Sequence, residues 1–129
     1  MAKGNQLYIC VDFDGTCITH DYPKIGKEVG AAKILRALVA KGHMLILFTM
    51  RSGKSLEDAV DWFKLNEIEL FGIQRNPTQV WTTSPKAYGH LYIDDAALGA
   101  PLKFDATLSN RPYIDWTEVE SLLTQMCLL

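Results

Sequence analysis

The apolar run Leu7–Val11 ends directly on the sequence DFDGT, in which Asp12 and Asp14 are separated by one residue. A continuous apolar run with β-branched and aromatic members is typical of a strand buried on both faces, as in a parallel sheet. Gly15 and Thr16 fit a turn. A turn does not explain Asp12, because burying an unpaired carboxylate is costly. Partners for Asp12 are therefore expected from elsewhere in the chain.

The other apolar segments alternate between strand and helix patterns. Strands are predicted at Met44–Phe48, Glu69–Ile73, His90–Ile93 and, more briefly, within residues 102–107. Helical spacing is predicted after Gly30, after a Ser55 cap up to about Asn66, and after an Asp115 cap. This alternation predicts an α/β fold, a Rossmann-like open and mostly parallel sheet with helices on both faces. A chain of 129 residues is expected to form a single domain, residues 1–129.

Composition narrows the function classes. The formal net charge of −2 is spread without runs, which argues against non-specific binding to nucleic acids or to anionic membranes. No apolar stretch approaches the roughly 20 residues of a membrane span. The three cysteines show no CxxC spacing, which argues against a disulfide framework and a zinc knuckle. A cytoplasmic location is therefore expected.

Polar side chains stand at the predicted strand ends. Asp12 follows the first strand, Thr49 the second, and Asp94 and Asp95 the fourth, with Lys86 shortly before that strand. Open α/β sheets bind ligands at the carboxyl ends of their strands, so these groups are expected to converge. Three carboxylates repel one another without a cation, and oxygen ligands suit Mg²⁺. The pattern predicts a magnesium and phosphate site.

The order and spacing of these segments resemble the haloacid dehalogenase superfamily. VDFDGT resembles its first motif, Thr49 after LILF its second, Lys86 its third, and YIDD its fourth, over roughly residues 7–95. A hydrophobic strand followed by DxDGT is far more specific than any single motif. The resemblance implies a Mg²⁺-dependent phosphomonoester hydrolase.

The resemblance also implies individual roles. Asp12 would be the nucleophile that forms an aspartyl-phosphate, and Asp14 the general acid and then the general base. Mg²⁺ would be bound by the Asp12 side chain, the Asp14 backbone carbonyl, and either Asp94 or Asp95. Of the last two, Asp95 is the favoured ligand, with Asp94 holding Lys86.

Residues around these motifs are candidates for substrate binding. Thr49 and Lys86 are expected to face the phosphoryl group, with Met50 and Arg51 in the loop after the second strand also in contact with substrate. The alternative for Arg51 is an ordinary solvated arginine, and substrate contact is slightly favoured over it. Likewise, a lone histidine such as His20 is more often a surface residue or one with satisfied hydrogen bonds.

Many members of the superfamily carry an inserted cap domain, and neither gap between the motifs has room for one here. The predicted fold therefore has no cap, and the site should be open. An open site has no lid to exclude water from the reaction. We expect either a large phosphorylated substrate or a second subunit that covers the site, with specificity carried by residues 76–84, including Trp81, and 19–24.

Two alternatives belong to other classes. A receiver domain also gathers acidic residues, a threonine and a lysine, but its phosphorylated aspartate follows the acidic pair on a later strand, whereas here the pair comes first. An inactive relative used as a binding module is disfavoured because every reactive position is filled. A P-loop is disfavoured as well, since RSGKS has Phe48 where the first glycine is needed.

Overall fold

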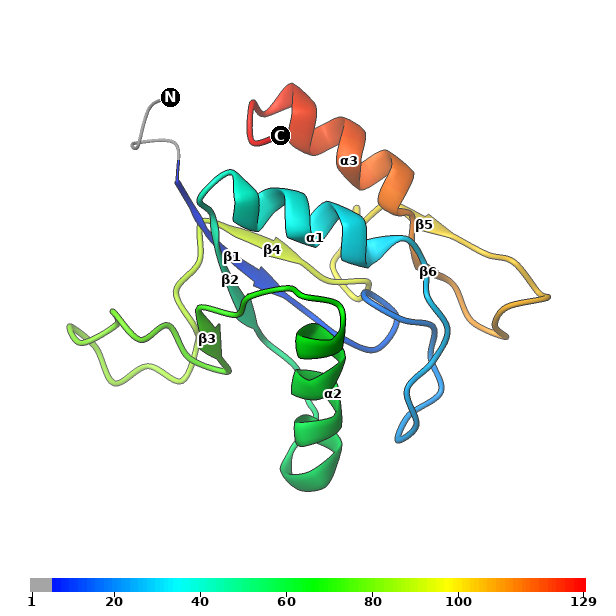
Figure 1. Cartoon of the computed structure of the whole chain (residues 1–129), viewed down its shortest axis with the longest axis horizontal. Coiled ribbons are helices and arrows are strands. Elements are labelled where there is room, and N and C mark those ends of the chain that lie inside the picture. Colours follow the sequence, from blue (N-terminus) through cyan, green and yellow to red (C-terminus); the bar gives the residue numbers. More distant parts are fainter. Residues whose placement is uncertain (1–5) are drawn as a thin grey trace.

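The computed structural model describes residues 6–129 and confirms the α/β class (Figure 1). Its main sheet is fully parallel, with the strand order β3-β2-β1-β4. The strands are β1 (Tyr8–Val11), β2 (Met44–Leu47), β3 (Gly72–Ile73) and β4 (Leu91–Ile93). Parallel neighbours require crossover connections, which the chain supplies between each successive pair.

The helices are α1 (Ala31–Ala40), α2 (Gly53–Leu65) and α3 (Trp116–Gln125). The Asp115 cap is confirmed, because its carboxylate accepts hydrogen bonds from the Thr117 and Glu118 amides. The prediction that Ser55 caps the second helix is wrong, because α2 already begins at Gly53 and the Ser55 hydroxyl donates to the Ser52 carbonyl.

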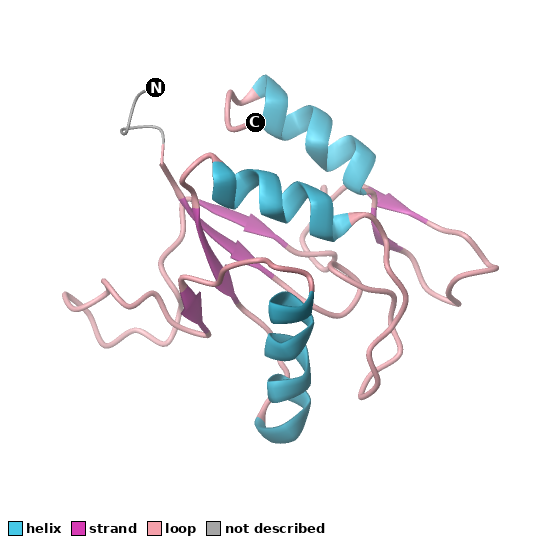
Figure 2. Ribbon diagram, in the orientation of Figure 1, coloured by secondary structure: helices cyan, strands magenta, loops and turns pink. Residues whose placement is uncertain are grey.

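A small second sheet lies outside the main one. Its strands are β5 (Leu102–Lys103) and β6 (Tyr113–Ile114), which pair antiparallel. The loop between them is drawn as an extended excursion in Figure 2. Only the first of these strands is predicted by the sequence pattern.

All three helices bury their apolar residues in one cluster. That cluster contains Ile9 and Val11 from β1, together with Leu45 and Leu47 from β2. The opposite side of the sheet has a small cluster of its own, to which the loop after β3 contributes Ala87 and to which no helix within residues 6–129 contributes. The helix expected on this second face is absent because the connection from β3 to β4 is a loop (Figure 2).

Strand β1 fixes the position of the site. It lies between β2 and β4, and Ile9 and Val11 are fully buried, a burial that contributes about 1.5–3 kcal/mol for each side chain. Val11 pairs with Leu47 and with Ile93, so β1, β2 and β4 end together. Within residues 6–129, no helix is long and apolar enough to cross a membrane.

Candidate active site

Three carboxylates meet where β1 and β4 end. Asp12, Asp94 and Asp95 each offer an oxygen, and these oxygens lie within 4.8 Å of one another. The sheet creates this proximity directly, because the Asp12 amide donates to the Ile93 carbonyl at 3.0 Å. The expected convergence of the first and fourth motifs is therefore observed in the structure.

The electrostatics of this cluster favour a cation. The pKa of Asp12 is raised to about 8, chiefly by burial and then by the negative charge of Asp94, whereas a hydrogen bond from Thr16 opposes the shift. A carboxylate surrounded by carboxylates ionises more readily once a cation neutralises the group. An all-oxygen donor set of this kind fits Mg²⁺ better than a softer metal.

Thr16 joins the two acidic strand ends. Its hydroxyl donates to Asp12 Oδ2 at 2.9 Å and accepts from the Asp95 amide at 3.1 Å. Its backbone carbonyl accepts from the indole nitrogen of Trp116 at 2.6 Å. Thr16 and Trp116 are buried, so this hydrogen bond fixes the DGT turn, residues 14–16, to the first residue of helix α3. The turn is thereby fixed relative to both carboxylates.

His20 is the site residue that the sequence analysis undervalued. Its Nε2 lies 2.9 Å from Asp95 Oδ2, so the imidazole orients one of the clustered carboxylates. Gly15 makes room for this pair, because a Cβ at that position would collide with both His20 and Asp95. Gly15 also has φ +81°, which disfavours any residue with a side chain.

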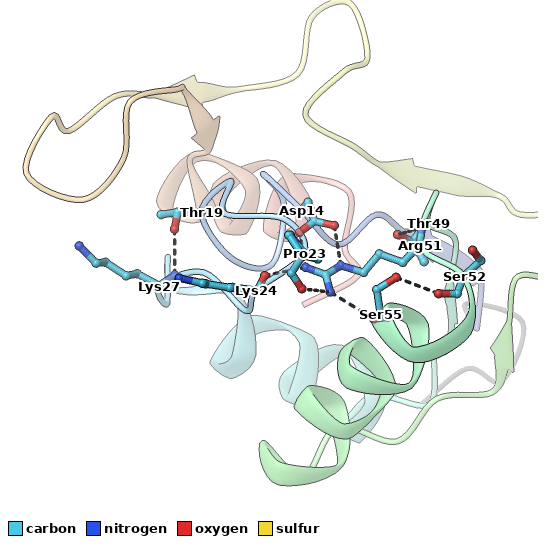
Figure 3. A network of polar contacts seen from close by, with 9 residues as sticks. All are labelled: Asp14, Thr19, Pro23, Lys24, Lys27, Thr49, Arg51, Ser52 and Ser55. Atoms are coloured by element: carbon cyan, nitrogen blue, oxygen red, sulfur yellow. Dashed lines mark hydrogen bonds and ion pairs between the residues drawn. The ribbon is translucent and has the colours of Figure 1, made fainter.

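Asp14 faces a different partner (Figure 3). Its two oxygens accept hydrogen bonds from Arg51, at 2.8 Å from Nε and at 2.7 Å from Nη2. This is a bidentate pair, the strongest geometry for a carboxylate and a guanidinium. Asp14 therefore lies outside the carboxylate cluster, although it is only two residues from Asp12.

Arg51 also holds the segment that follows the DGT turn. Its remaining three N–H groups donate to the backbone carbonyls of Pro23, Lys24 and Ser55, at 3.0, 2.7 and 3.1 Å (Figure 3). The side chain is 1% exposed. A guanidinium has five N–H donors, and all five are used. In this structure Arg51 clamps Asp14 to residues 23 and 24, and its contact with substrate stays a prediction.

The loop after β2 presents Thr49 and Met50. The Thr49 hydroxyl accepts a hydrogen bond from the Arg51 amide at 3.1 Å, which leaves its proton able to point toward a phosphate. Gln74 fixes this loop, accepting from the Thr49 amide at 2.8 Å and donating to the Thr49 carbonyl at 2.6 Å. Met50 is 97% exposed, and it is connected with the site only by its place in the loop between Thr49 and Arg51.

Lys86 lies on the second face of the sheet. Its ammonium is 5.2 Å from the centre of the Tyr92 ring, a cation–π distance. Among the described residues it forms no ion pair, so the expected pairing with Asp94 is not observed. The ammonium does act on Cys10: burial raises the pKa of this thiol to about 11 even though the charge of Lys86 opposes the shift. Lys86 therefore lies on the same face of the sheet as Cys10.

The comparisons with known proteins give one relative and no family name. No protein-family model and no curated protein matches the chain. A solved structure, of a conserved protein from Bacteroides thetaiotaomicron, is similar over 73% of this chain and 79% of that one. The two sequences are 35% identical over this region, and the TM-score is 0.68.

Proposed function

The chain belongs to the same family as this conserved Bacteroides thetaiotaomicron protein, and from its own site we propose that it is a Mg²⁺-dependent phosphomonoester hydrolase. The observation that carries the proposal is the group of three carboxylates from Asp12, Asp94 and Asp95 at adjacent strand ends. The resemblance of the four motifs to haloacid dehalogenases supports the same activity. The free cysteines Cys10, Cys17 and Cys127 agree with a cytoplasmic setting.

Mg²⁺ would be held by Asp12, by Asp95 or Asp94, and by the backbone carbonyl of Asp14. When bound, it neutralises the carboxylates and the substrate phosphate. Asp95 is the better placed of the two fourth-motif residues, because His20 fixes its carboxylate and its backbone amide donates to the Thr16 hydroxyl. Asp94 instead accepts the Ala96 amide at 2.8 Å in the following turn.

In the proposed reaction, an Asp12 oxygen attacks phosphorus and the bond to the leaving oxygen breaks. Asp14 supplies the proton that this oxygen needs, and then takes a proton from the water that hydrolyses the aspartyl-phosphate. Thr49 and Lys86 face the phosphoryl charge. Positioning and electrostatic stabilisation account for most of the rate in such transfers.

The Asp14–Arg51 pair constrains this proposal. Protonation of Asp14 removes its negative charge and weakens both bonds from Arg51. We therefore expect the pair to loosen when Asp14 acts as the acid. Because Arg51 also holds the carbonyls of Pro23 and Lys24, proton transfer would be coupled to movement of this segment.

The test is the variant Asp12→Asn, assayed for phosphate release from an aryl phosphate with Mg²⁺. We expect a loss of at least about a thousandfold in kcat, the range found when a residue of the reacting machinery is removed. Asp61→Asn, an exposed carboxylate on α2, is the matched control and should keep full activity. Unchanged turnover in Asp12→Asn would refute the nucleophile. A single turnover per wild-type chain would favour the receiver-like switch.

A further inference from the structure

The segment between β3 and β4, residues 74–90, is a long irregular connection with an ordered interior. Loops of this length without secondary structure are uncommon in small domains and are usually functional. This one lies over the face of the sheet that no helix covers. Lys86, predicted to face the phosphoryl group, belongs to the same segment.

Two buried amides give the segment its shape. Gln79 donates to the Lys86 carbonyl at 2.9 Å and accepts from the Tyr88 amide at 2.7 Å. Asn76 donates to the Tyr88 carbonyl at 3.0 Å and accepts from the Thr78 amide at 2.9 Å. Both side chains are buried, so these bonds are shielded from water. The segment is preorganised.

This segment forms one side of an open pocket of about 360 Å³. Trp81, Tyr88 and Tyr92 contribute aromatic surface, and Trp81 packs edge-on against Tyr88 with 5.4 Å between ring centres. The hydroxyls of Thr82 and Ser84 also line it, and each accepts a backbone amide and so keeps its proton available to a ligand. An apolar, aromatic pocket with a few polar groups is typical of a small-molecule site.

The pocket lies beside β4, the strand that Asp94 and Asp95 directly follow. Tyr92 is the middle residue of β4 and lines the pocket, and Asp94 is the first residue after this strand. Lys86 lines the pocket and rests above the Tyr92 ring. Lys86 is thus the link between the pocket and the predicted phosphate site, and a phosphate that contacts both Lys86 and the carboxylates would have its leaving group beside the aromatic side chains.

Resting on the proposed function, we propose that this pocket binds the leaving group of the substrate and that this group carries a planar aromatic ring, as in a nucleoside monophosphate. Trp81 is 62% exposed, which is unusual for so large an apolar surface and leaves its ring open to stacking. The Thr82 and Ser84 hydroxyls would hydrogen-bond polar atoms at the edge of the ring.

The experiment compares nucleoside 5′-monophosphates with glycerol phosphate as substrates, in the wild type and in Trp81→Ala, Trp81→Phe and Phe104→Ala. Stacking of one base on an aromatic side chain corresponds to about 5- to 150-fold in binding. We expect kcat/KM for the nucleotides to fall by a factor in this range in Trp81→Ala, and much less in Trp81→Phe. Hydrolysis of glycerol phosphate should stay unchanged. Phe104→Ala removes an exposed ring outside the pocket and should behave as wild type.

A binding measurement separates this proposal from the proposed function. Trp62 and Trp116 are buried at 8% and 3% exposure, so an added nucleoside should quench the fluorescence of Trp81 selectively, even in Asp12→Asn. Quenching that disappears in Trp81→Phe supports the pocket whether or not phosphate is released. Equal kcat/KM in wild type and Trp81→Ala, or absent quenching, overturns it. A dimer that dissociates in Trp81→Ala without a change in kcat/KM also overturns it, because the surface would then be a subunit interface.

Discussion

Asp12 and Asp14 are separated by one residue and have opposite surroundings. Asp12 lies among carboxylates, without a cationic side chain in ion-pair contact among the described residues, and its pKa is raised to about 8, chiefly by burial. Asp14 has both oxygens bound by the buried guanidinium of Arg51. The fold thus holds the carboxylates of the Asp12 cluster close together without a neutralising cation among the described residues. The charge of Asp14, by contrast, is balanced by Arg51, which also joins the segment at residues 23 and 24 to the start of α2.

The difference indicates where a ligand is needed. Interior charges are normally paired, and those without a partner concentrate at functional sites. A chain of this size has little stability to spare, so a destabilising cluster is expected only where it serves binding or catalysis. Asp12 is thus expected to matter for activity, and Arg51 mainly for the architecture that holds Asp14.

The largest change in stability is expected from Arg51→Met. This substitution leaves Asp14 without its cation and three backbone carbonyls without their donor, and breaking a buried ion pair costs about 3–5 kcal/mol. Chemical denaturation measures the free energy of unfolding. Lys54→Met is the matched control, because the Lys54–Asp58 pair is largely exposed and should contribute little. An equal loss of unfolding free energy in Arg51→Met and Lys54→Met would contradict the structural role given to the Asp14–Arg51 pair.

A smaller effect is expected in the pH dependence of stability of the metal-free protein. The folded pKa of Asp12 is about 8 and the unfolded value 3.8, so between these pH values the folded chain keeps a proton that the unfolded chain releases. The contribution of Asp12 is therefore fully present below pH 3.8 and is lost as the pH rises to 8.

Denaturation of the wild type and of Asp12→Asn between pH 4 and pH 8 measures this contribution. The free energy of unfolding should fall more steeply with pH in the wild type than in the variant, and Mg²⁺ should reduce the difference. Parallel curves would show that the carboxylate is not perturbed.

The carboxylate cluster was predictable from sequence because it depends on the backbone alone. Apolar runs locate the strands, parallel strands end at one edge, and Asp12, Asp94 and Asp95 follow those ends. No side-chain direction had to be known. The same reasoning located Thr49, and the Asp115 cap followed from a local pattern.

Residues whose roles depend on side-chain direction were not predictable in this way. Arginine is usually exposed, and nothing in TMRSG shows that Arg51 turns inward, although Asp14 beside an apolar strand needed a cation. His20 and Gln74 act through partners distant in sequence. The missing helix on the second face did leave a signal, because QRNPTQVWTTSPK contains two prolines and no helical spacing.

The central claim is that the three carboxylates bind one divalent cation, and calorimetric titration of the protein with Mg²⁺ at pH 8 tests it most directly. We predict one ion per chain, with affinity at least about tenfold weaker in Asp95→Asn and unchanged in Asp61→Asn. Heat that is absent, or identical in wild type and Asp95→Asn, would contradict the claim.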